Sequence, residues 1–403
     1  MDGRVSGEVP RVTRRVLLPD QVRVARYRRV PELGPQLLFF SGGSAIRRLS
    51  RSLKHLTHNS VHLVTPFDSG GSSAVLRRAF GMLSIGDLRN RLMALADETV
   101  RGSPQVYDLF SHRFDAGADA SSLVLRLEAL VAGTDPLIAA VPSPLRRLIR
   151  THLGIFARRM PPSFDLRGAS IGNLVLVGGW LNNDRDIDSV AFLFSKLVEA
   201  RGTVLPVVDA SLHLAADLED GSTVIGQHRL TGKEGPPPGS AVRGLRLVES
   251  LEDPRPATTT IHDKVRRLIE GADLLCFPMG SFYSSVIANL LPVGVGRAVA
   301  AADCPKVYVP NTGHDPEQVG LSVADALDVL LQRLRADAGA DVPTSRLVDF
   351  VLLDRRMDLY ENGVDLGKIR NLGAVPVEAQ LTAAPNADLL DSELLAETLV
   401  SFA

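Results

Sequence analysis

Three short apolar runs in this sequence each end in a loop rich in glycine and serine. Residues 36–40 precede SerGlyGlySer, residues 61–67 precede AspSerGlyGlySerSer, and residues 273–277 precede ProMetGlySer. Helical patterns follow the first two loops, so the repeated unit is strand, loop and helix. This repetition favours an α/β fold with a doubly wound, mostly parallel, Rossmann-like sheet that has helices on both faces.

The middle of the chain adds two features to this sheet. Leucines recur at helical spacing between about residues 109 and 160, which predicts a helical insertion. AspGly at 220–221 lies between alternating segments of residues 213–230, which predicts an antiparallel hairpin. Further on, the patterns predict a helix over 263–270 and a last apolar strand at 350–353.

The chain divides unevenly at about residue 33. Residues 1–33 are rich in arginine and show no helical stripe, so we expect an N-terminal extension that is solvated or packs on an edge. A basic arm that touches nucleic acid is the alternative, and the neutral remainder disfavours it. Residues 34–403 are expected to form a single α/β domain.

Charge and composition restrict the partners. The 45 Lys and Arg residues nearly balance 46 Asp and Glu, so no overall field attracts nucleic acid or a membrane. We therefore expect a small-molecule partner, with no nucleic acid and no membrane; a homodimer is compatible with the sequence. Signal-peptide and membrane-spanning patterns are missing, which predicts a cytoplasmic location. The two cysteines lack any zinc-binding spacing.

The glycine loops themselves suggest an anion site. Glycine lets backbone N–H groups approach phosphate oxygens, and ligands of open α/β sheets bind at the carboxyl ends of the strands. One such loop is more often a simple turn, whereas three at strand ends favour phosphate binding. The sequence has no GxGxxG or GxxxxGK[ST] motif, which disfavours a classical dehydrogenase or a P-loop ATPase.

Several polar residues near these loops are candidates for chemistry. Asp68 ends an apolar run, where a carboxylate could bind Mg²⁺ or accept a proton, or could simply close an Asx turn. Asp87 is placed to cap a helix over 88–97, and Arg89 and Asn90 could reach a phosphate or base from its first turn. Asn173 falls in the first turn of an apolar helix, where neighbouring glycines could serve packing alone.

Residues 281–285, SerPheTyrSerSer, follow the third loop. Their hydroxyls and aromatic ring could bond phosphate and stack on a base. The alternative is an ordinary helix start with Ser281 as its cap.

Taken in order, these blocks resemble the CofD/YvcK-like (UPF0052) family of the 2-phospho-L-lactate transferase superfamily, over residues 36 to about 335. The strongest stretch is ValThrProPheAspSerGlyGlySerSer at 64–73, continued by GlyAspLeuArgAsn at 86–90. Further matches are HisArgPhe at 112–114, GlyAsn at 172–173, the block from 272 and LysValTyrValProAsn from 306. The layout is also similar to the "GAK system" CofD-like proteins, a lineage rather than an activity.

The resemblance implies a doubly wound core that binds a nucleotide-linked ligand, and two functions. The first is a transferase that uses Mg²⁺ to move a phospho-lactyl group from a nucleoside diphosphate to a hydroxyl acceptor, which is 2-phospho-L-lactate transferase-like activity. The alternative is a YvcK-like, non-catalytic nucleotide-sugar-binding regulator of carbon metabolism and cell morphology.

The resemblance also implies site residues. Carried over by motif, the nucleotide and phosphate site comprises Gly42, Gly43, Gly70, Gly71, Ser72, Ser73, Asn90, Asn173, Gly280 and Ser281. Neighbouring residues that complete the predicted site are Ser44, Ser69, Asp87, Arg89, Tyr283, Ser284 and Asn311. Asp68 takes the catalytic role and is the candidate Mg²⁺ ligand. The sequence departs from the family where Ser69 replaces the second acid of an Asp-Asp pair and where the first loop lacks a third glycine and a threonine, and both changes bear on metal-dependent transfer.

Overall fold

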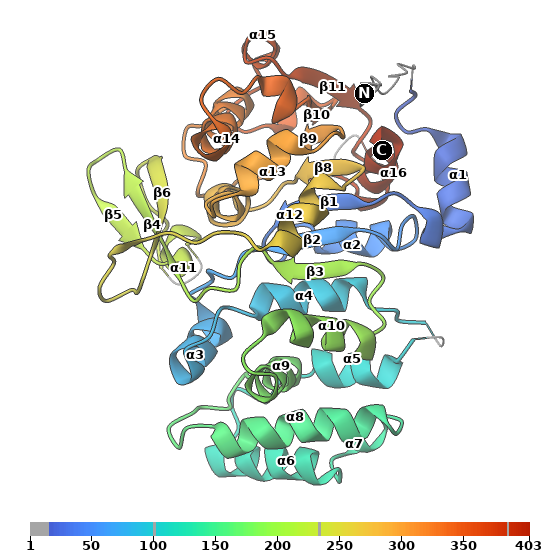
Figure 1. The fold of residues 1–403 in the computed structure, drawn as a ribbon, viewed down its shortest axis with the longest axis vertical. Helices are drawn as coiled ribbons and strands as arrows, with labels where there is room; N and C mark the ends of the chain where they lie inside the picture. Colours follow the sequence, from blue (N-terminus) through green and yellow to red (C-terminus); the bar gives the residue numbers. More distant parts are fainter. Residues whose placement is uncertain (1–15, 100–101, 233–234, 385–386) are drawn as a thin grey trace, which may run out of the picture.

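The computed structural model describes residues 16–99, 102–232, 235–384 and 387–403, and its core is a seven-stranded sheet (Figure 1). The strand order is β11-β10-β9-β8-β1-β2-β3, and all six pairings are parallel. The strands are β1 Leu37–Ser41, β2 Val61–Val64, β3 Thr203–Pro206, β8 Leu274–Phe277, β9 Lys306–Tyr308, β10 Phe350–Asp354 and β11 Val375–Ala379. The predicted α/β class with a parallel sheet is confirmed.

The central strand β1 shows why these runs are apolar throughout. All five of its residues are buried. Leu37 and Phe39 enter the core on one face of the sheet, and Leu38 and Phe40 enter the core on the other, because side chains alternate along a strand. A strand covered on both faces needs apolar residues at every position.

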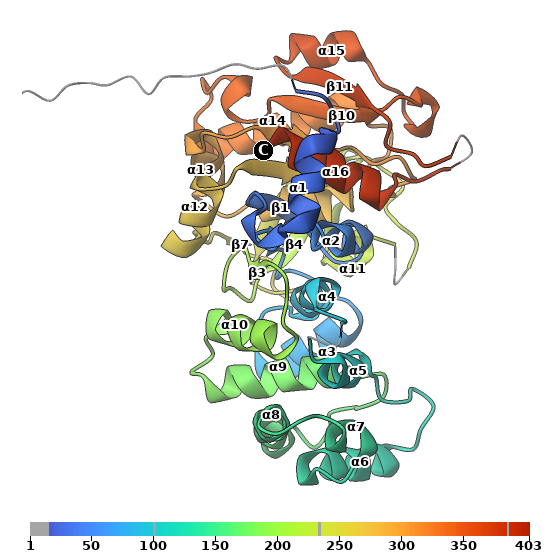
Figure 2. The same cartoon turned by 90° about the vertical axis from the view of Figure 1, so that its right-hand side faces the viewer.

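Helices cover both faces, as the doubly wound prediction requires (Figures 1 and 2). One face is covered by α1 Gln21–Arg29, α2 Arg47–Leu53 and α16 Ser392–Phe402. The opposite face is covered by α12 Asp263–Glu270, α13 Val295–Ala301 and α14 Val323–Ala338.

The chain order reverses between two neighbouring strands. From β1 the chain proceeds to β2 and β3 on one side, and from β8 it proceeds to β9, β10 and β11 on the other. The β1 and β8 strands are paired in register from Leu37 with Leu274. Open α/β sheets bind ligands at such a switch point, outside the carboxyl ends of the strands.

The expected helical insertion is present as a lobe on one side of the sheet, and it extends beyond the predicted residues 109–160 at both ends (Figure 1). Its helices are α3 Gly71–Phe80, α4 Gly86–Leu95, α5 Pro104–Ser111, α6 Ala120–Ala132, α7 Pro136–Ala139, α8 Leu145–Arg159, α9 Ile171–Asn182 and α10 Ile187–Leu197. A Cβ at Gly178 would lie 1.9 Å from the carbonyl oxygen of His152, so glycine permits the close contact of α8 with α9. The packing of α8 on α9 therefore requires glycine at position 178.

The predicted hairpin is also confirmed. The strands β4 His213–Leu218 and β5 Thr223–Ile225 pair antiparallel around AspGly at 220–221. With β6 Val242–Val248 and β7 Pro256–Ala257 they form a second sheet of order β5-β4-β6-β7. The short helix α11 Gln227–Leu230 follows β5.

At both ends of the described chain, the structure differs from what the sequence predicts. The strand expected to be last, β10, is followed by α15 Leu366–Asn371 and by β11, which adds one more parallel strand at the edge. At the other end, α1 packs on α16, and the Asp20 backbone N–H donates to Ser401 Oγ at 2.8 Å. Residues 1–15 of the expected extension lie outside the described residues.

Within the described ranges, none of the helices combines the length and the apolar character needed to span a membrane.

Candidate functional site

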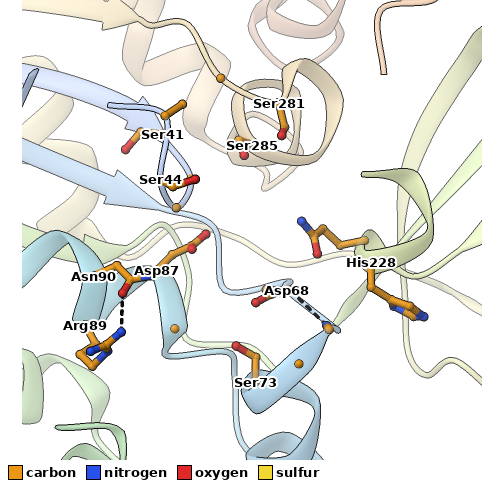
Figure 3. Close-up of a pocket in the computed structure, with 18 of the residues that line it drawn as sticks. Ser41, Ser44, Asp68, Ser73, Asp87, Arg89, Asn90, His228, Ser281 and Ser285 are labelled. Atoms are coloured by element: carbon orange, nitrogen blue, oxygen red, sulfur yellow. Dashed lines mark hydrogen bonds between the residues drawn. The ribbon is translucent and has the colours of Figure 1, made fainter. Parts of the chain in front are cut away.

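A cavity of about 310 Å³ opens at the switch point of the sheet (Figure 3). The loops after β1, β2 and β8 supply much of its wall. The starts of α3, α4 and α9, the helix α11, the π-helix Phe282–Ile287 and Arg113 supply the rest. The first-turn N–H groups of an α-helix have no acceptor within the helix, so two ten-residue helices, α3 and α4, begin at this cavity with their positive dipole ends.

Most of the predicted residues line this cavity together. They are Gly42, Gly43, Ser44, Asp68, Gly70, Gly71, Ser72, Ser73, Asp87, Arg89, Asn90, Asn173, Gly280 and Ser281. Four predicted residues are not part of the lining: Ser69, Tyr283, Ser284 and Asn311. The sequence reasoning missed Ser41, Ala45, Ile46, Gly86, Arg113, Gln227, His228, Met279, Ser285 and Val286, which also line it.

The glycines are required by close contacts between the loops. A Cβ at Gly42 would lie 2.2 Å from Ser285 Oγ, and a Cβ at Gly43 would lie 2.4 Å from Asp87 Oδ1. The first loop therefore packs directly against the segment after β8 and the start of α4. Any larger residue would push these walls apart.

Asp68 closes the predicted Asx turn and also lines the cavity. Its Oδ1 accepts a hydrogen bond from the Gly70 backbone N–H at 3.1 Å, which is the Asx turn. The same side chain lines the cavity, with Oδ2 3.8 Å from the Cβ position of Gly86 (Figure 3). Arg77 holds the turn from behind by donating to the Asp68 carbonyl at 3.0 Å.

The prediction that Asp87 caps its helix is wrong. The helix α4 begins at Gly86, the residue at the cap position is Ile85, and no side chain caps this end. Ile85 is 1% exposed, so apolar burial fixes the entry into α4. The Asp87 carboxylate is directed instead toward the first loop, beside Gly43 (Figure 3).

One end of the cavity carries guanidinium and amide groups. Arg89 is 7% exposed and donates to Asn90 Oδ1 and, at 3.4 Å, to the Phe110 carbonyl. Burial, with the charge of Arg113 nearby, lowers the pKa of Arg89 to about 10, so it stays protonated at neutral pH. Asn173 is 1% exposed, and its Oδ1 has no hydrogen-bond partner in the described structure. A buried amide oxygen without a partner at a cavity wall is suited to a ligand donor.

Ser69 connects the second loop to the small sheet. Its hydroxyl lies 2.8 Å from His228 Nδ1, which turns the Ser69 side chain away from the cavity. Gln227 and His228 of α11 line the cavity on this side. Because 159 positions separate Ser69 from His228, no local pattern predicts this contact.

The segment after β8 forms a π-helix, Phe282–Ile287, rather than a regular α-helix. Tyr283 is 3% exposed and donates its hydroxyl to the Val242 carbonyl at 3.0 Å, so it does not face the cavity as a base-stacking ring. Ser284 is also buried, whereas Ser285 lines the cavity. Ser281 sits at the cap position without a side-chain capping bond.

The oxygen donors of the cavity fit Mg²⁺ in part. Asp68 and Asp87 both line it, and Mg²⁺ in nucleotide sites is usually held by one or two carboxylates together with phosphates and waters. The described residues include no cluster of three or more acidic, histidine or cysteine side chains that could hold an ion alone. A metal here would depend on ligand oxygens.

Comparison with known proteins agrees with this architecture. Residues 37–387 match the model of the family described as 2-phospho-L-lactate transferase CofD. The chain is similar to the gluconeogenesis factor of Bacillus subtilis (strain 168), with 31% identity over 301 residues, 74% of this chain and 75% of that protein. A putative gluconeogenesis factor of Nostoc sp. is 29% identical over 72% of this chain, which spans 50% of that protein.

A solved structure supports the fold. The crystal structure of a UPF0052 family member from Bacillus halodurans matches with a TM-score of 0.64 and 24% identity, over 91% of this chain and 98% of that chain. The family match over most of the chain, with the site at its switch point, confirms the resemblance seen in the motifs: this chain belongs to the CofD family.

Proposed function

We propose that this protein is a nucleotide-sugar-binding regulator of carbon metabolism that acts in the cytoplasm. The observation that carries the proposal is the convergence of three Gly/Ser loops and two helix N-termini on one cavity. Backbone N–H groups and helix dipoles bind phosphate without a strongly basic surface, which suits a chain of net charge −1.

The lining fits a ligand with both polar and apolar parts. Arg89, Asn90 and Asn173 offer donors and an acceptor for a sugar or base, and Ile46 and Met279 offer apolar contact. A cavity of about 310 Å³ lies at the small end of the usual range for small-molecule sites, so part of a nucleotide sugar would extend beyond it. The gluconeogenesis factors among the relatives support a role in carbon metabolism.

A second candidate is transfer of a phospho-lactyl-type group to a hydroxyl acceptor. It is favoured by the family model and by the two carboxylates, Asp68 and Asp87, in one cavity. In that reaction Asp68 would orient the acceptor hydroxyl for attack on the lactyl-bearing phosphorus of a nucleoside diphosphate, the P–O bond between the two phosphates would break, and the nucleoside monophosphate would leave. Asp68 and Asp87 would hold a Mg²⁺ ion, which would offset the charge of the diphosphate.

Calorimetric titration separates the two candidates. The purified chain is titrated with a uridine diphosphate sugar, with guanosine and uridine diphosphates, and with a guanosine diphosphate that carries a lactyl group on its terminal phosphate, each with and without Mg²⁺. The lactyl-bearing nucleotide is then incubated with the protein and a deazaflavin acceptor. The regulator binds the sugar nucleotide saturably and forms no product. Transfer predicts Mg²⁺-dependent binding of a guanosine diphosphate species and a product that needs the acceptor. No binding of any nucleotide would contradict both candidates.

A further inference from the structure

Two carboxylates are buried behind the wall of the cavity, in the loop after β9. Asp315 is 9% exposed and Glu317 is 3% exposed. Neither forms an ion pair with a lysine or arginine of the described residues, although buried acids are normally paired. Their partners are backbone and hydroxyl groups instead.

Three of these hydrogen bonds come from the segment that forms the cavity wall. Asp315 Oδ2 accepts from the Phe282 backbone N–H at 2.8 Å. Glu317 Oε2 accepts from the Ser284 backbone N–H at 2.7 Å, and its Oε1 accepts from the Ser284 hydroxyl. The two acids therefore hold alternate backbone groups at the start of the π-helix.

A third side chain of the same loop holds the preceding glycine. Asn311 Oδ1 accepts from the Gly280 backbone N–H at 2.8 Å, and Asn311 Nδ2 donates to the Gly280 carbonyl at 2.8 Å. The same amide donates to Asp315 Oδ2 at 3.1 Å. Gly280 has a φ of +149°, a conformation that favours glycine, and these bonds keep it there.

The held segment presents its other side to the ligand site. Gly280, Ser281, Ser285 and Val286 line the cavity, whereas Phe282 and Ser284 face the acids. We propose that Asn311, Asp315 and Glu317, here named the carboxylate clamp, are positioning residues that set the cavity wall at 280–286 and couple anionic ligand binding there to uptake of a proton. The proposal rests on the phosphate-binding role of the cavity.

The charge of the clamp gives the direction of this coupling. Burial, together with the charge of Asp315, raises the pKa of Glu317 to about 7, and burial also raises the pKa of Asp315. Above that pH the clamp carries one more negative charge behind the wall than it carries below it. Repulsion then weakens binding of an anion at high pH, and by reciprocity a bound anion favours the protonated clamp.

Among the described residues no lysine or arginine pairs with this charge, and the charge of His314 acts against it at Asp315. Two tyrosines lie near the acids of the clamp, Tyr283 of the π-helix and Tyr308 of β9. Both are neutral near pH 7, because burial raises the pKa of each. From the clamp's own loop come the Gln318 amide, which bonds Asn311, and His314, whose ring lies 3.0 Å from Glu361. Tyr360, also with a raised pKa, is the remaining ionisable group near Tyr308.

The test is a pH series of calorimetric titrations with a nucleoside diphosphate sugar. The pyrophosphate diester of this probe keeps a constant charge between pH 6 and 8, so the ligand does not titrate. Wild-type affinity is expected to fall by about three- to tenfold from pH 6 to pH 8. Glu317→Gln should bind with a flat pH profile, and Glu128→Gln, an exposed acid of α6, should keep the wild-type slope.

Two further variants test whether Glu317 is the group that causes the pH dependence. Ser284→Ala removes a bond that lowers the pKa of Glu317, so the midpoint of the affinity profile should move to higher pH. This milder change also covers the case in which Glu317→Gln folds poorly. His228→Gln alters a histidine of the cavity lining, and loss of the pH dependence in this variant would assign the coupling to His228 and overturn the clamp.

The outcomes are distinguishable. Wild-type protein that binds the probe equally at all pH values, or a Glu317→Gln variant with the wild-type slope, would overturn the clamp and leave the nucleotide site standing. Wild-type protein that does not bind the probe would overturn the proposed function and the coupling with it.

Discussion

The guanidinium of Arg91 donates a hydrogen bond to the carbonyl oxygen of Gly42 at 2.8 Å, from a side chain with no exposed surface. It also donates to the Gly43 carbonyl at 3.1 Å and to Ser50 Oγ at 2.6 Å. Burial lowers the pKa of Arg91 to about 10, so it remains charged at neutral pH. One arginine of α4 thus holds the first glycine loop and α2 together behind the site.

Replacing Arg91 should destabilise the protein and loosen the loop. Arg91→Met leaves three acceptors without their donor, so the free energy of unfolding should fall by about 3 kcal/mol. Arg91→Lys should give an intermediate loss, because one ammonium cannot reach all three oxygens. Urea unfolding measures both. The control is Arg147→Met, exposed on α8, and a comparable loss there would contradict the assignment.

Gly43→Ala should abolish ligand binding. The added Cβ would lie 2.4 Å from Asp87 Oδ1, so either the Asp87 carboxylate or the first loop must move, and both line the cavity. Gly244→Ala is the matched control, since a Cβ there meets no atom within 4 Å and the residue lies in the small sheet. Calorimetry with a uridine diphosphate sugar should show loss for the first variant alone. Full affinity in Gly43→Ala would mean that this loop is not part of the site.

Asp68→Asn tests the role of the carboxylate charge while the Asx turn is kept. Asparagine keeps an oxygen for the Gly70 N–H, so the loop should stay folded, while the carboxylate is lost. We expect metal-free binding of the sugar nucleotide to be kept or strengthened and any Mg²⁺ enhancement to disappear. If product formation is detected with the wild-type protein, this variant should lose it. Binding lost without Mg²⁺ would indicate a direct contact of Asp68 with the ligand.

Acid should destabilise the fold through His213. Burial and the neighbouring charge of Arg77 lower the pKa of His213 to about 4, while the unfolded chain binds the same proton near 6.5. Between these values only the unfolded state is protonated, so stability falls as pH falls through this window. His213→Gln should reduce the pH dependence of unfolding by up to one proton. Urea unfolding at pH 7.5, 6 and 5 measures it, and an unchanged slope would contradict the shift.

The sequence is most informative where local composition alone decides the structure. Buried parallel strands need uninterrupted apolar runs, and the loops after them need glycine, so the strand ends and their loops were predictable. Most of the lining residues came from the resemblance to the family. The helix over 263–270 was also predicted with the bounds found in α12, because its apolar residues Val265 and Ile269 fall on one face. The edge strand β11 was missed because Pro376 and two exposed positions break its apolar pattern.

The unpredicted parts of the site depend on geometry between distant segments. A π-helix has a wider turn than an α-helix, which changes the residues that face the cavity from Tyr283 and Ser284 to Ser285 and Val286. Asp87 was predicted to be a helix cap because the sequence around it does not reveal its contact with the loop at Gly43, which is distant in the sequence. Arg91 gave no signal at all, since an arginine in a helix is usually exposed.

Hydrogen–deuterium exchange with and without a uridine diphosphate sugar would show where on the protein the ligand binds. Bound ligand should slow exchange in the three loops at 41–46, 68–73 and 279–286 and at the start of α4, all of which line the cavity. The same experiment on Gly43→Ala should show no protection at the same ligand concentration. Saturable binding that protects other segments while these three loops exchange as in the free protein would contradict the account.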